Sequence, residues 1–426
     1  MSHRLSIWLI TIGEPLPIDG RRDRSWRTGL LAEVLAARGH DVLWWTSTVD
    51  HFRKQFFVEG EPRVSSRIGV PIQFLRGALY RRNLSLSRLV NHAQIARRFA
   101  ALARRESPPD IIVCSFPTIE LSREAVRYGA AAGVPVILDV RDLWPDIFLD
   151  VVPRAAKWLT RLALRALFAD TQYALSRCDA VLGVSDAYLE WGLRKAGRSA
   201  STSDRTFPLG YRPTAWSQRD ASSVDERLRA AGVESDLPLV TFAGTFGRTY
   251  DLRTVIEAAV QLRESHGQRV HFVLCGAGER DAQWRARATG RDVTFTGWLP
   301  APELAYLLAK SSLGLAAYSA NAPQGIPNKV IEYLAASLPV LSCLPGECRD
   351  LLSSAHCGAY YEAENPAALA AAIRAALADR ERLVAMRAAA RALFEQRFSS
   401  DTVYADMADH LERIAGRSAG ERRSTG

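Results

Sequence analysis

The sequence predicts an α/β protein made of two doubly wound domains in tandem. Short apolar runs alternate with helical patterns, as in parallel sheets covered by helices on both faces. This alternation stops in a polar segment between about residues 198 and 236 and then begins again. The chain has 426 residues, of which 48% are apolar and 24% charged, so it has material for two full cores.

The first half contains the patterns of one such domain. We expect strands at residues 5–12, 41–46, 110–114, 134–140 and 180–184, and helices at about 24–38, 122–132 and 154–176. The strands are short and almost entirely apolar, which indicates burial on both faces. No small-residue cleavage site follows the first of them, which favours a buried strand over the apolar core of a signal peptide. Residues 1–212 are assigned to this N-terminal Rossmann-like domain.

The second half repeats the pattern. We expect strands at residues 239–243, 270–275, 293–295, 313–316 and 339–342, and helices at about 251–264, 327–337, 366–378, 380–395 and 400–415. Residues 213–398 are assigned to a C-terminal Rossmann-like domain and 399–416 to a last helix, followed by a disordered tail from Arg417. Two such sheets direct the carboxyl ends of their strands toward a shared cleft, where ligands bind in these folds.

The net excess of positive charge lies in the first half. Of the 55 Lys and Arg against 46 Asp and Glu, residues 1–216 hold 31 basic and 21 acidic side chains. Ten arginines and no acid lie between Pro62 and Arg105. This half is suited to an anionic partner: a membrane surface, a phosphorylated lipid or nucleic acid. Nucleic acid is disfavoured, because few aromatic residues that would stack on bases interrupt the basic stretch.

Membrane contact is expected to be peripheral, since no apolar run approaches the roughly 18 residues of a spanning helix. The six cysteines form no C-x-x-C pair and show no metal-ligand spacing with histidine. We expect them to be reduced and mostly buried, in a cytoplasmic protein.

Glycine-rich turns follow two strands of the second domain. The first is Gly244-Thr245-Phe246-Gly247-Arg248, and the second contains Gly276 and Gly278. Glycine lets the backbone approach a phosphate closely, a following helix offers free amides, and Arg248 adds a charge. The alternative is a tight turn with a solvated arginine. The acidic residue that a dinucleotide-binding fingerprint requires about 20 residues later is not evident, which disfavours a dehydrogenase.

The segment from Ala322 to Val340 is the most informative. Pro327 suits the first position of a helix, so Gly325, Ile326, Pro327 and Asn328 deliver backbone amides to the cleft together with Lys329. Glu332 lies three residues after Lys329 on the same helical face, where its carboxylate can accept two ribose hydroxyls. A cation for a diphosphate beside a carboxylate for ribose fits a nucleotide-sugar site. The alternative is an ordinary salt bridge between Lys329 and Glu332.

These motifs, in this order, resemble the donor half of family 4 glycosyltransferases. They continue with Thr296-Gly297-Trp298-Leu299-Pro300 and with the run Asn328-Lys329-x-x-Glu332-Tyr333-Leu334-Ala335-Ala336-x-x-Pro339-Val340. In the first half, Arg38-Gly39-His40-x-Val42 resembles another family motif. The run Asp139-Val140-Arg141-Asp142-Leu143-Trp144-Pro145-Asp146 is similar to one in members that assemble bacterial O-antigen, capsule or exopolysaccharide. The resemblance spans about residues 5–413 and implies the GT-B fold, two Rossmann-like domains facing across a cleft.

The resemblance also implies roles. Arg248 and Lys329 would hold the donor diphosphate, Glu332 the ribose, and Trp298 would lie near the base. The last helix, 399–416, would cross back to the first domain. The family works without a bound metal or cofactor, with the nucleotide-sugar as co-substrate, and it retains anomeric configuration. The family pattern E-x7-E has Gln324 in place of its first Glu, and Gln324 would lie near the transferred sugar. A neutral amide still hydrogen-bonds hydroxyls, so we favour a different sugar over reduced activity.

In the first domain, Arg141 and Asp142 follow a buried strand and are expected to face the cleft. Asp142 is a candidate to orient or deprotonate the acceptor hydroxyl, and Arg141 to bind phosphate or sugar. The alternative is an Arg–Asp pair that pins the loop. Gly13, Gly20 and Arg24 lie on the loop after the first strand, which in the family approaches the donor phosphates or the acceptor.

Two basic amphipathic patterns suggest docking on anionic lipid. One places Leu86, Leu89, Val90, Ala93, Ala96, Phe99 and Ala100 beside five arginines; the other places Trp158, Leu159 and Leu162 beside Arg154, Lys157, Arg161 and Arg165. We expect the apolar faces to point mostly inward and the arginines to face membrane phosphates.

The leading hypothesis is a retaining, metal-independent glycosyltransferase that moves a hexosyl or N-acetylhexosaminyl group from a UDP-linked donor to a lipid-linked saccharide. It would act on the cytoplasmic face of the bacterial inner membrane in lipopolysaccharide or exopolysaccharide biosynthesis. Three alternatives remain open: a basic membrane- or anion-binding module with impaired catalysis, a nucleotide-sugar epimerase, and a nucleic-acid-binding protein.

Overall fold

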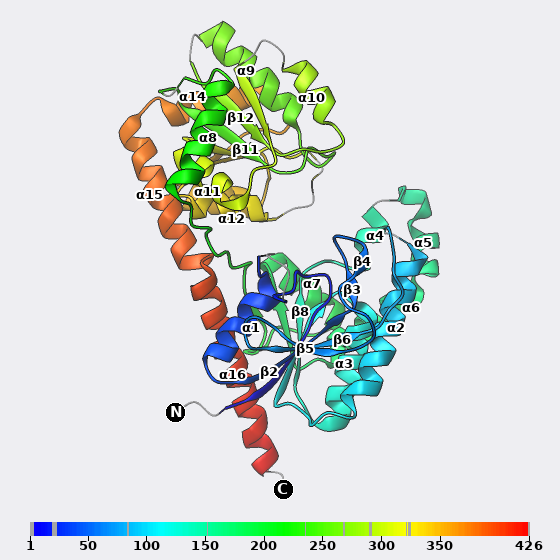
Figure 1. Ribbon diagram of the computed structural model, residues 1–426. Helices are drawn as coiled ribbons and strands as arrows, with labels where there is room; N and C mark the ends of the chain where they lie inside the picture. Colours follow the sequence, from blue (N-terminus) through cyan, green and yellow to red (C-terminus); the bar gives the residue numbers. More distant parts are fainter. Residues whose placement is uncertain are drawn as a thin grey trace. The chain divides into compact units, whose positions relative to one another are not determined.

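The computed structural model describes residues 4–18, 24–82, 85–150, 152–234, 236–266, 269–288, 292–320, 322 and 325–424. It divides the chain into two compact units: unit 1 is Met1–Leu209 with Val403–Gly426, and unit 2 is Gly210–Thr402. Each unit is an α/β fold built on a parallel sheet (Figure 1), as the sequence predicts. The divisions lie near the expected boundaries at residues 212 and 398.

Unit 1 is built on an eight-stranded sheet, counted over its described residues, with the order β10-β9-β8-β7-β1-β2-β6-β5. All neighbouring strands are parallel except β5 and β6. Its elements are β1 (Ser6–Ile10), α1 (Arg27–Ala37), β2 (Asp41–Ser47), β3 (Val49–Asp50), β4 (Gln55–Phe56), β5 (Arg63–Ser65), β6 (Pro71–Leu75), α2 (Leu86–Ala103), β7 (Ile111–Phe116), α3 (Ile119–Ala132), β8 (Val136–Val140), α4 (Ile147–Asp150), η1 (Arg154–Ala156), α5 (Lys157–Ala163), α6 (Arg165–Arg177), β9 (Ala180–Gly183), α7 (Asp186–Ala196) and β10 (Arg205–Thr206).

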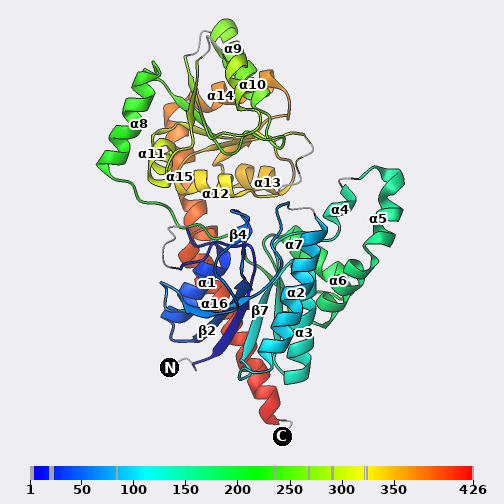
Figure 2. The same cartoon turned by 45° about the vertical axis from the view of Figure 1, so that its right-hand side comes forward.

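Alternate residues of the central strands enter two separate cores. Side chains of a parallel strand point to opposite faces in turn, so Ile7 and Leu9 pack on one side of β1 while Trp8 and Ile10 pack on the other. Helix α1 and the last helix of the chain cover the first face, and α2, α3 and α6 cover the second (Figure 2). The apolar character of the strand runs follows from this burial on both faces.

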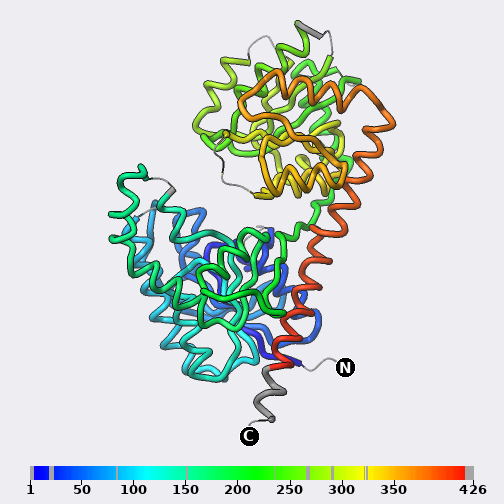
Figure 3. The backbone as a smooth tube through the Cα atoms, turned by 180° about the vertical axis from the view of Figure 1, so that it is seen from behind, coloured from blue at the N-terminus to red at the C-terminus, as the bar shows by residue number. Residues whose placement is uncertain are grey.

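The chain returns to unit 1 through α16 (Ser400–Ser424), which lies beside α1 (Figure 3). Tyr404, Met407 and Leu411 are buried in the first core. Glu412 accepts hydrogen bonds from Arg38, at 2.9 Å, and from the His40 ring, at 3.0 Å. The expected disorder of the tail from Arg417 stays a prediction, because most of that tail lies outside the residues whose side chains the structure describes.

Unit 2 contains a six-stranded parallel sheet, counted over its described residues, with the order β13-β12-β11-β14-β15-β16. Its elements are α8 (Gln218–Ala230), β11 (Leu239–Ala243), α9 (Leu252–His266), β12 (His271–Cys275), α10 (Asp281–Arg287), β13 (Val293–Gly297), α11 (Ala301–Lys310), β14 (Leu313–Ala316), α12 (Asn328–Ala335), β15 (Val340–Ser342), α13 (Glu347–Ser354), β16 (Gly358–Tyr360), α14 (Pro366–Leu377) and α15 (Arg380–Arg397). The order reverses between β13 and β14, so α9 and α10 cover one face and α11 to α13 the other.

The first and last residues of unit 2 pair with each other. The Tyr211 amide donates to the Phe398 carbonyl at 2.8 Å, and the Ser400 amide donates to the Tyr211 carbonyl at 3.0 Å. The chain therefore enters and leaves unit 2 at one place.

Three local expectations need correction. The segment at 198–236, interpreted as a linker, contains β10 and also α8, which Ser217 and Asp220 begin with a capping box. Strand β6 lies inside the basic stretch, where no strand was expected. The single helix expected at 154–176 is η1, α5 and α6. Among the described residues, no helix is both long and apolar enough to cross a membrane.

Candidate functional site

The glycine turns of unit 2 follow β11 and β12 and are held against each other. The Gly244 amide donates to the Cys275 carbonyl at 2.9 Å, and the Phe246 amide donates to the Ala277 carbonyl at 3.0 Å. Gly244 and Gly276 have φ angles of +154° and +141°. A Cβ on Gly276 would collide with the Gly244 carbonyl oxygen, and one on Gly278 would lie 2.7 Å from the Phe246 oxygen. These glycines therefore allow two loops to meet at one edge of the sheet.

Lys329 lies on α12 at the same edge, and its ammonium group is buried among aromatic rings. Nζ is 3.6 Å from the ring centre of Phe242, 3.9 Å from Tyr250 and 5.4 Å from Tyr318. Within the described part of the chain, Nζ has no hydrogen-bond partner. The predicted alternative of a salt bridge with Glu332 is thus not formed. Burial lowers the pKa of Lys329 well below its ordinary value, although the Glu332 carboxylate opposes the change.

Tyr333 fixes α12 against the sheet. Its buried hydroxyl accepts a hydrogen bond from the Ala243 amide at 2.9 Å and donates one to the Leu315 carbonyl at 3.2 Å. A Cβ on Gly314 would lie 2.6 Å from the Tyr333 ring, so the close packing of ring and strand requires glycine there. Pro327 is the N-cap of α12 rather than its first residue, which corrects the expectation by one position.

The remaining predicted donor residues are more accessible. Arg248 is 82% exposed and pairs with Glu279 at 3.3 Å. Trp298 is 62% exposed. Thr245 and Asn328 are exposed, whereas Gly247, Gly325, Ile326, Pro327 and Glu332 are partly buried. A Cβ on Gly247 would meet no atom within 4 Å. Gln324 lies outside the described residues.

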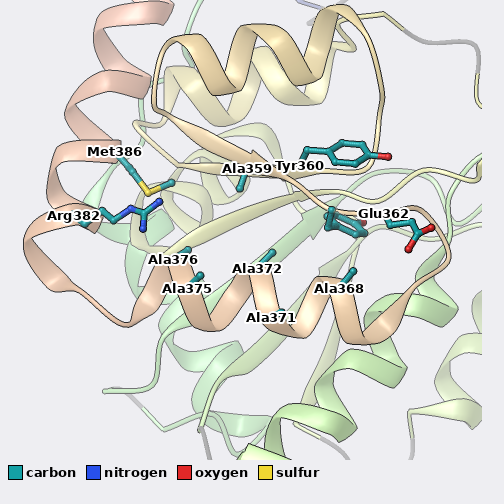
Figure 4. A pocket seen from close by; sticks show the side chains of 11 residues that line it. Ala359, Tyr360, Glu362, Ala368, Ala371, Ala372, Ala375, Ala376, Arg382 and Met386 are labelled. Carbon is teal, nitrogen blue, oxygen red and sulfur yellow. The ribbon is translucent and has the colours of Figure 1, made fainter.

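A separate groove of about 400 Å³ in unit 2 lies between α14, β16 and the start of α15. Figure 4 shows alanine side chains of α14 along one wall, with Arg382 and Met386 at one end and Glu362 at the other. None of the predicted site residues lines it.

In unit 1, Arg141 belongs to a buried ionic network at the end of β8. Asp139 accepts two hydrogen bonds from Arg27, both at 2.8 Å, and one from Arg141 at 2.7 Å. Arg141 also pairs with Glu14, which accepts a bond from the Thr28 hydroxyl at 2.8 Å. Burial would raise the pKa of Asp139, but the two guanidinium groups hold it at about 2. The predicted loop-pinning pair is present, with Asp139 rather than Asp142 as the acid.

Asp142 lies outside this network. Burial raises its pKa, and hydrogen bonds from the Leu143 amide and the Trp144 side chain oppose the increase. The Arg88 guanidinium, which stacks 4.6 Å from a ring centre of Trp144, is electrostatically attracted to Asp142. Asp142 is therefore a partly buried carboxylate beside a cation.

His51 and Tyr80 lie near the same cation. The His51 Nδ1 and Tyr80 hydroxyl are 2.7 Å apart, and the Arg88 guanidinium lies 5.8 Å from the Tyr80 ring centre. Burial, reinforced by Lys54 and Arg88, lowers the pKa of His51 to about 4. A Cβ on Gly13, whose φ is +77°, would be 3.7 Å from the His51 Cβ, so the loop after β1 reaches this cluster. Arg24 is exposed, and Gly20 lies outside the described residues.

Two families of domains match most of the chain. Residues 25–201 match the family model described as "Glycosyl transferase 4-like domain", and residues 237–379 match the one described as "Glycosyl transferases group 1". The chain is a family 4-type glycosyltransferase. No curated protein shows significant sequence similarity to it.

Solved structures confirm the GT-B fold of this glycosyltransferase. Sucrose-phosphate synthase from Thermosynechococcus elongatus is 18% identical, with a TM-score of 0.69 over 97% of this chain and 100% of that one. HepE from Anabaena, in complex with UDP and glucose, is 17% identical, with a TM-score of 0.63 over 96% and 100%. WaaG, a glycosyltransferase of lipopolysaccharide biosynthesis, is 17% identical, with a TM-score of 0.58 over 95% and 99%.

Several residues around these clusters were not predicted from the sequence. Glu14, Arg27 and Thr28 complete the network of Asp139, and Tyr250 and Tyr318 enclose Lys329. Arg88 attracts Asp142 and lies near His51 and Tyr80, although these residues come from separate segments. An acid immediately after the first strand was the one local signal that could have identified Glu14.

Proposed function

We propose that this glycosyltransferase transfers a sugar from a UDP-linked donor to a lipid-linked saccharide acceptor during bacterial cell-surface polysaccharide synthesis. The observation that carries the proposal is the Lys329 ammonium, which is buried without a hydrogen-bond partner among the described residues and lies beside the loops of Gly244 and Gly276. A diphosphate would supply the anion that this cation lacks.

The donor half of the reaction follows from charge. As the glycosidic bond to the nucleotide breaks, negative charge accumulates on the leaving diphosphate. Lys329 would stabilise that charge from a site that already excludes water, where an electrostatic interaction is strongest. Arg248, exposed at the turn after β11, would add a second charge on the solvent side. Glu332 would accept the ribose hydroxyls, and Trp298 would lie against the base. Gln324 would hydrogen-bond the transferred sugar.

The acceptor half is proposed for Asp142. A carboxylate whose pKa is raised by burial binds a proton more readily than a solvated one, so Asp142 is suited to orient the acceptor hydroxyl and take its proton. Arg141 already has carboxylate partners, so its role is to hold the loop that carries Asp142. We propose a metal-independent reaction that retains anomeric configuration, as in the related family.

Peripheral attachment to the cytoplasmic face of the inner membrane is proposed for α5. Not one residue of this helix is buried, which corrects the expectation that its apolar side chains point inward. Trp158 and Leu162 are exposed on α5 together with Arg161. Apolar and basic side chains on one short helix are suited to anionic lipid.

The donor site is tested by thermal unfolding with UDP, GDP, ADP and their sugar conjugates. At one hundred times the Kd, a ligand stabilises the native state by about 2.7 kcal/mol. We expect UDP to stabilise the wild type and to have little effect on Lys329→Met. Lys310→Met is the matched control, because Lys310 pairs with Asp225 elsewhere in unit 2. Equal UDP stabilisation of all three proteins would overturn the assignment of Lys329, and stabilisation by no nucleotide would favour the catalytically impaired module.

A further inference from the structure

Unit 1 has an apolar groove of about 560 Å³ lined in part by Arg88 and Trp144. It lies between the start of α2, the segment around Trp144 and Phe148, and helices α5 and α6. Its apolar walls include Leu86, Leu89, Trp144, Phe148, Leu159 and Leu167, and its polar residues are Ser85, Arg88 and Thr160.

The rim of this groove exposes apolar side chains to solvent. Of the twelve large apolar side chains that are exposed in the described part of the chain, Leu86 and Leu159 line the groove, and Val90, Trp158 and Leu162 lie on the same two helices, α2 and α5. Leu86 is 81% exposed, although it begins a helix that was expected to direct its apolar face inward. A concentration of this kind marks a surface that binds another apolar group.

A cation borders the groove on the side of Asp142. Arg88 lines the groove and stacks on Trp144, while Lys54 lies 5.0 Å from the ring centre of Tyr80, which Arg88 also faces. The basic stretch of ten arginines without an acid surrounds this point in the sequence. An apolar groove bordered by positive charge is complementary to a hydrocarbon chain that carries an anionic head group.

Trp144 connects the groove to the candidate reacting group. Trp144 lines the groove and follows Asp142 by two residues, and Arg88, which also lines the groove, attracts the Asp142 carboxylate. A molecule whose chain fills the groove would therefore have its polar end beside both Arg88 and Asp142.

We propose that the groove holds the hydrocarbon chain of a lipid-phosphate acceptor, with Arg88 binding the phosphate and Asp142 facing the saccharide beyond it. This inference rests on the proposed function and names the part of the acceptor that the enzyme recognises. It differs from membrane docking, because Trp158 and Leu162 are exposed on α5 but do not line the groove.

The test uses the full chain and soluble probes that form no bilayer: geranyl phosphate, geraniol and inorganic phosphate, with affinities measured by calorimetry. The groove variants are Leu86→Glu and Leu159→Glu, at positions 81% and 51% exposed, where a carboxylate does not disturb the core. Val384→Glu is the control, because Val384 is 60% exposed and lies in unit 2. Arg88→Gln tests the phosphate contact. Each variant is also titrated with UDP.

We expect geranyl phosphate to bind the wild type at least tenfold more tightly than either geraniol or inorganic phosphate. The two groove variants should lose at least tenfold in this affinity, Val384→Glu should lose none, and Arg88→Gln should bind geranyl phosphate no better than geraniol. Unchanged affinity in the groove variants, or equal affinity of the wild type for geranyl phosphate and inorganic phosphate, overturns the proposal. If UDP still stabilises the protein in that case, the donor site stands and only the lipid groove is rejected.

Discussion

Replacing Lys329 by methionine is expected to stabilise the free enzyme while it removes donor binding. The ammonium is buried without a hydrogen-bond partner among the described residues, a situation that costs about 3 kcal/mol for a charged donor. Cation–π attraction to the rings of Phe242, Tyr250 and Tyr318 offsets about 1–2 kcal/mol of this free-energy cost. Methionine fills similar space without charge, so the net gain is about 1–2 kcal/mol.

In a unit of this size, that gain raises the unfolding temperature by about 2–8 °C. The measurement is calorimetric unfolding of wild type and Lys329→Met without ligand, followed by the same experiment with UDP. We expect the order of stability to reverse with UDP, because only the wild type gains binding energy. A variant that is less stable than wild type without ligand would refute the idea that the buried charge is held at a cost.

The pH dependence of the same comparison has a defined sign. The pKa of Lys329 is lower in the folded protein than in the unfolded chain, so the unfolded chain binds more protons between the two values. The stability of the wild type therefore rises with pH over that interval. The advantage of Lys329→Met should shrink as pH increases and vanish above the ordinary pKa of 10.5. A constant difference across this range would exclude titration of Lys329 as the cause.

Three further predictions follow from the local geometry. Gly276→Ala should destabilise unit 2 by at least about 3 kcal/mol in urea unfolding, because a Cβ would collide with the Gly244 carbonyl, whereas Gly247→Ala should change stability by less than about 1 kcal/mol. Arg27→Met should destabilise unit 1 by about 3–5 kcal/mol, because it removes a buried partner of Asp139. In the wild type, the pKa of Asp139 is about 2, so the stability that its ion pairs contribute is present above pH 3.8 and is lost as the pH falls through 2. Nuclear magnetic resonance should find that His51 titrates near pH 4, and a midpoint near 6.5 would contradict the burial of its ring.

Much of the fold was accessible from the sequence, because its strands are apolar on both faces. Runs such as residues 41–46 and 239–243 are almost entirely apolar, which favours burial on both faces of a sheet, and each forms an inner strand. Elements whose sequences carry only weak secondary-structure signals were not predicted. Strand β6 contains Pro71 and Gln73 within an arginine-rich segment, and α8 has only three buried residues, Ala221, Val224 and Leu228.

The site was predictable only where one motif contains its residues. Lys329, Glu332 and Tyr333 lie within a single turn or two of α12, so the sequence places them together. The cation that faces Asp142, Arg88, comes from a distant segment, as does His51 beside Arg88, and only the tertiary structure brings them together. Likewise, the sequence does not indicate that Arg141 pairs with Glu14, because Glu14 lies 127 residues away.

The pairing of Tyr211 with Phe398 and Ser400 also determines how this molecule bears mechanical load. Both ends of the described chain belong to unit 1, and the chain enters and leaves unit 2 at adjacent residues. A force applied between residues 4 and 424 therefore stretches unit 1 first, with unit 2 attached as a side branch outside the line of tension. In a pulling experiment, unit 2 should extend only after α16 has been peeled from α1 and the hydrogen bonds of Tyr211 have broken.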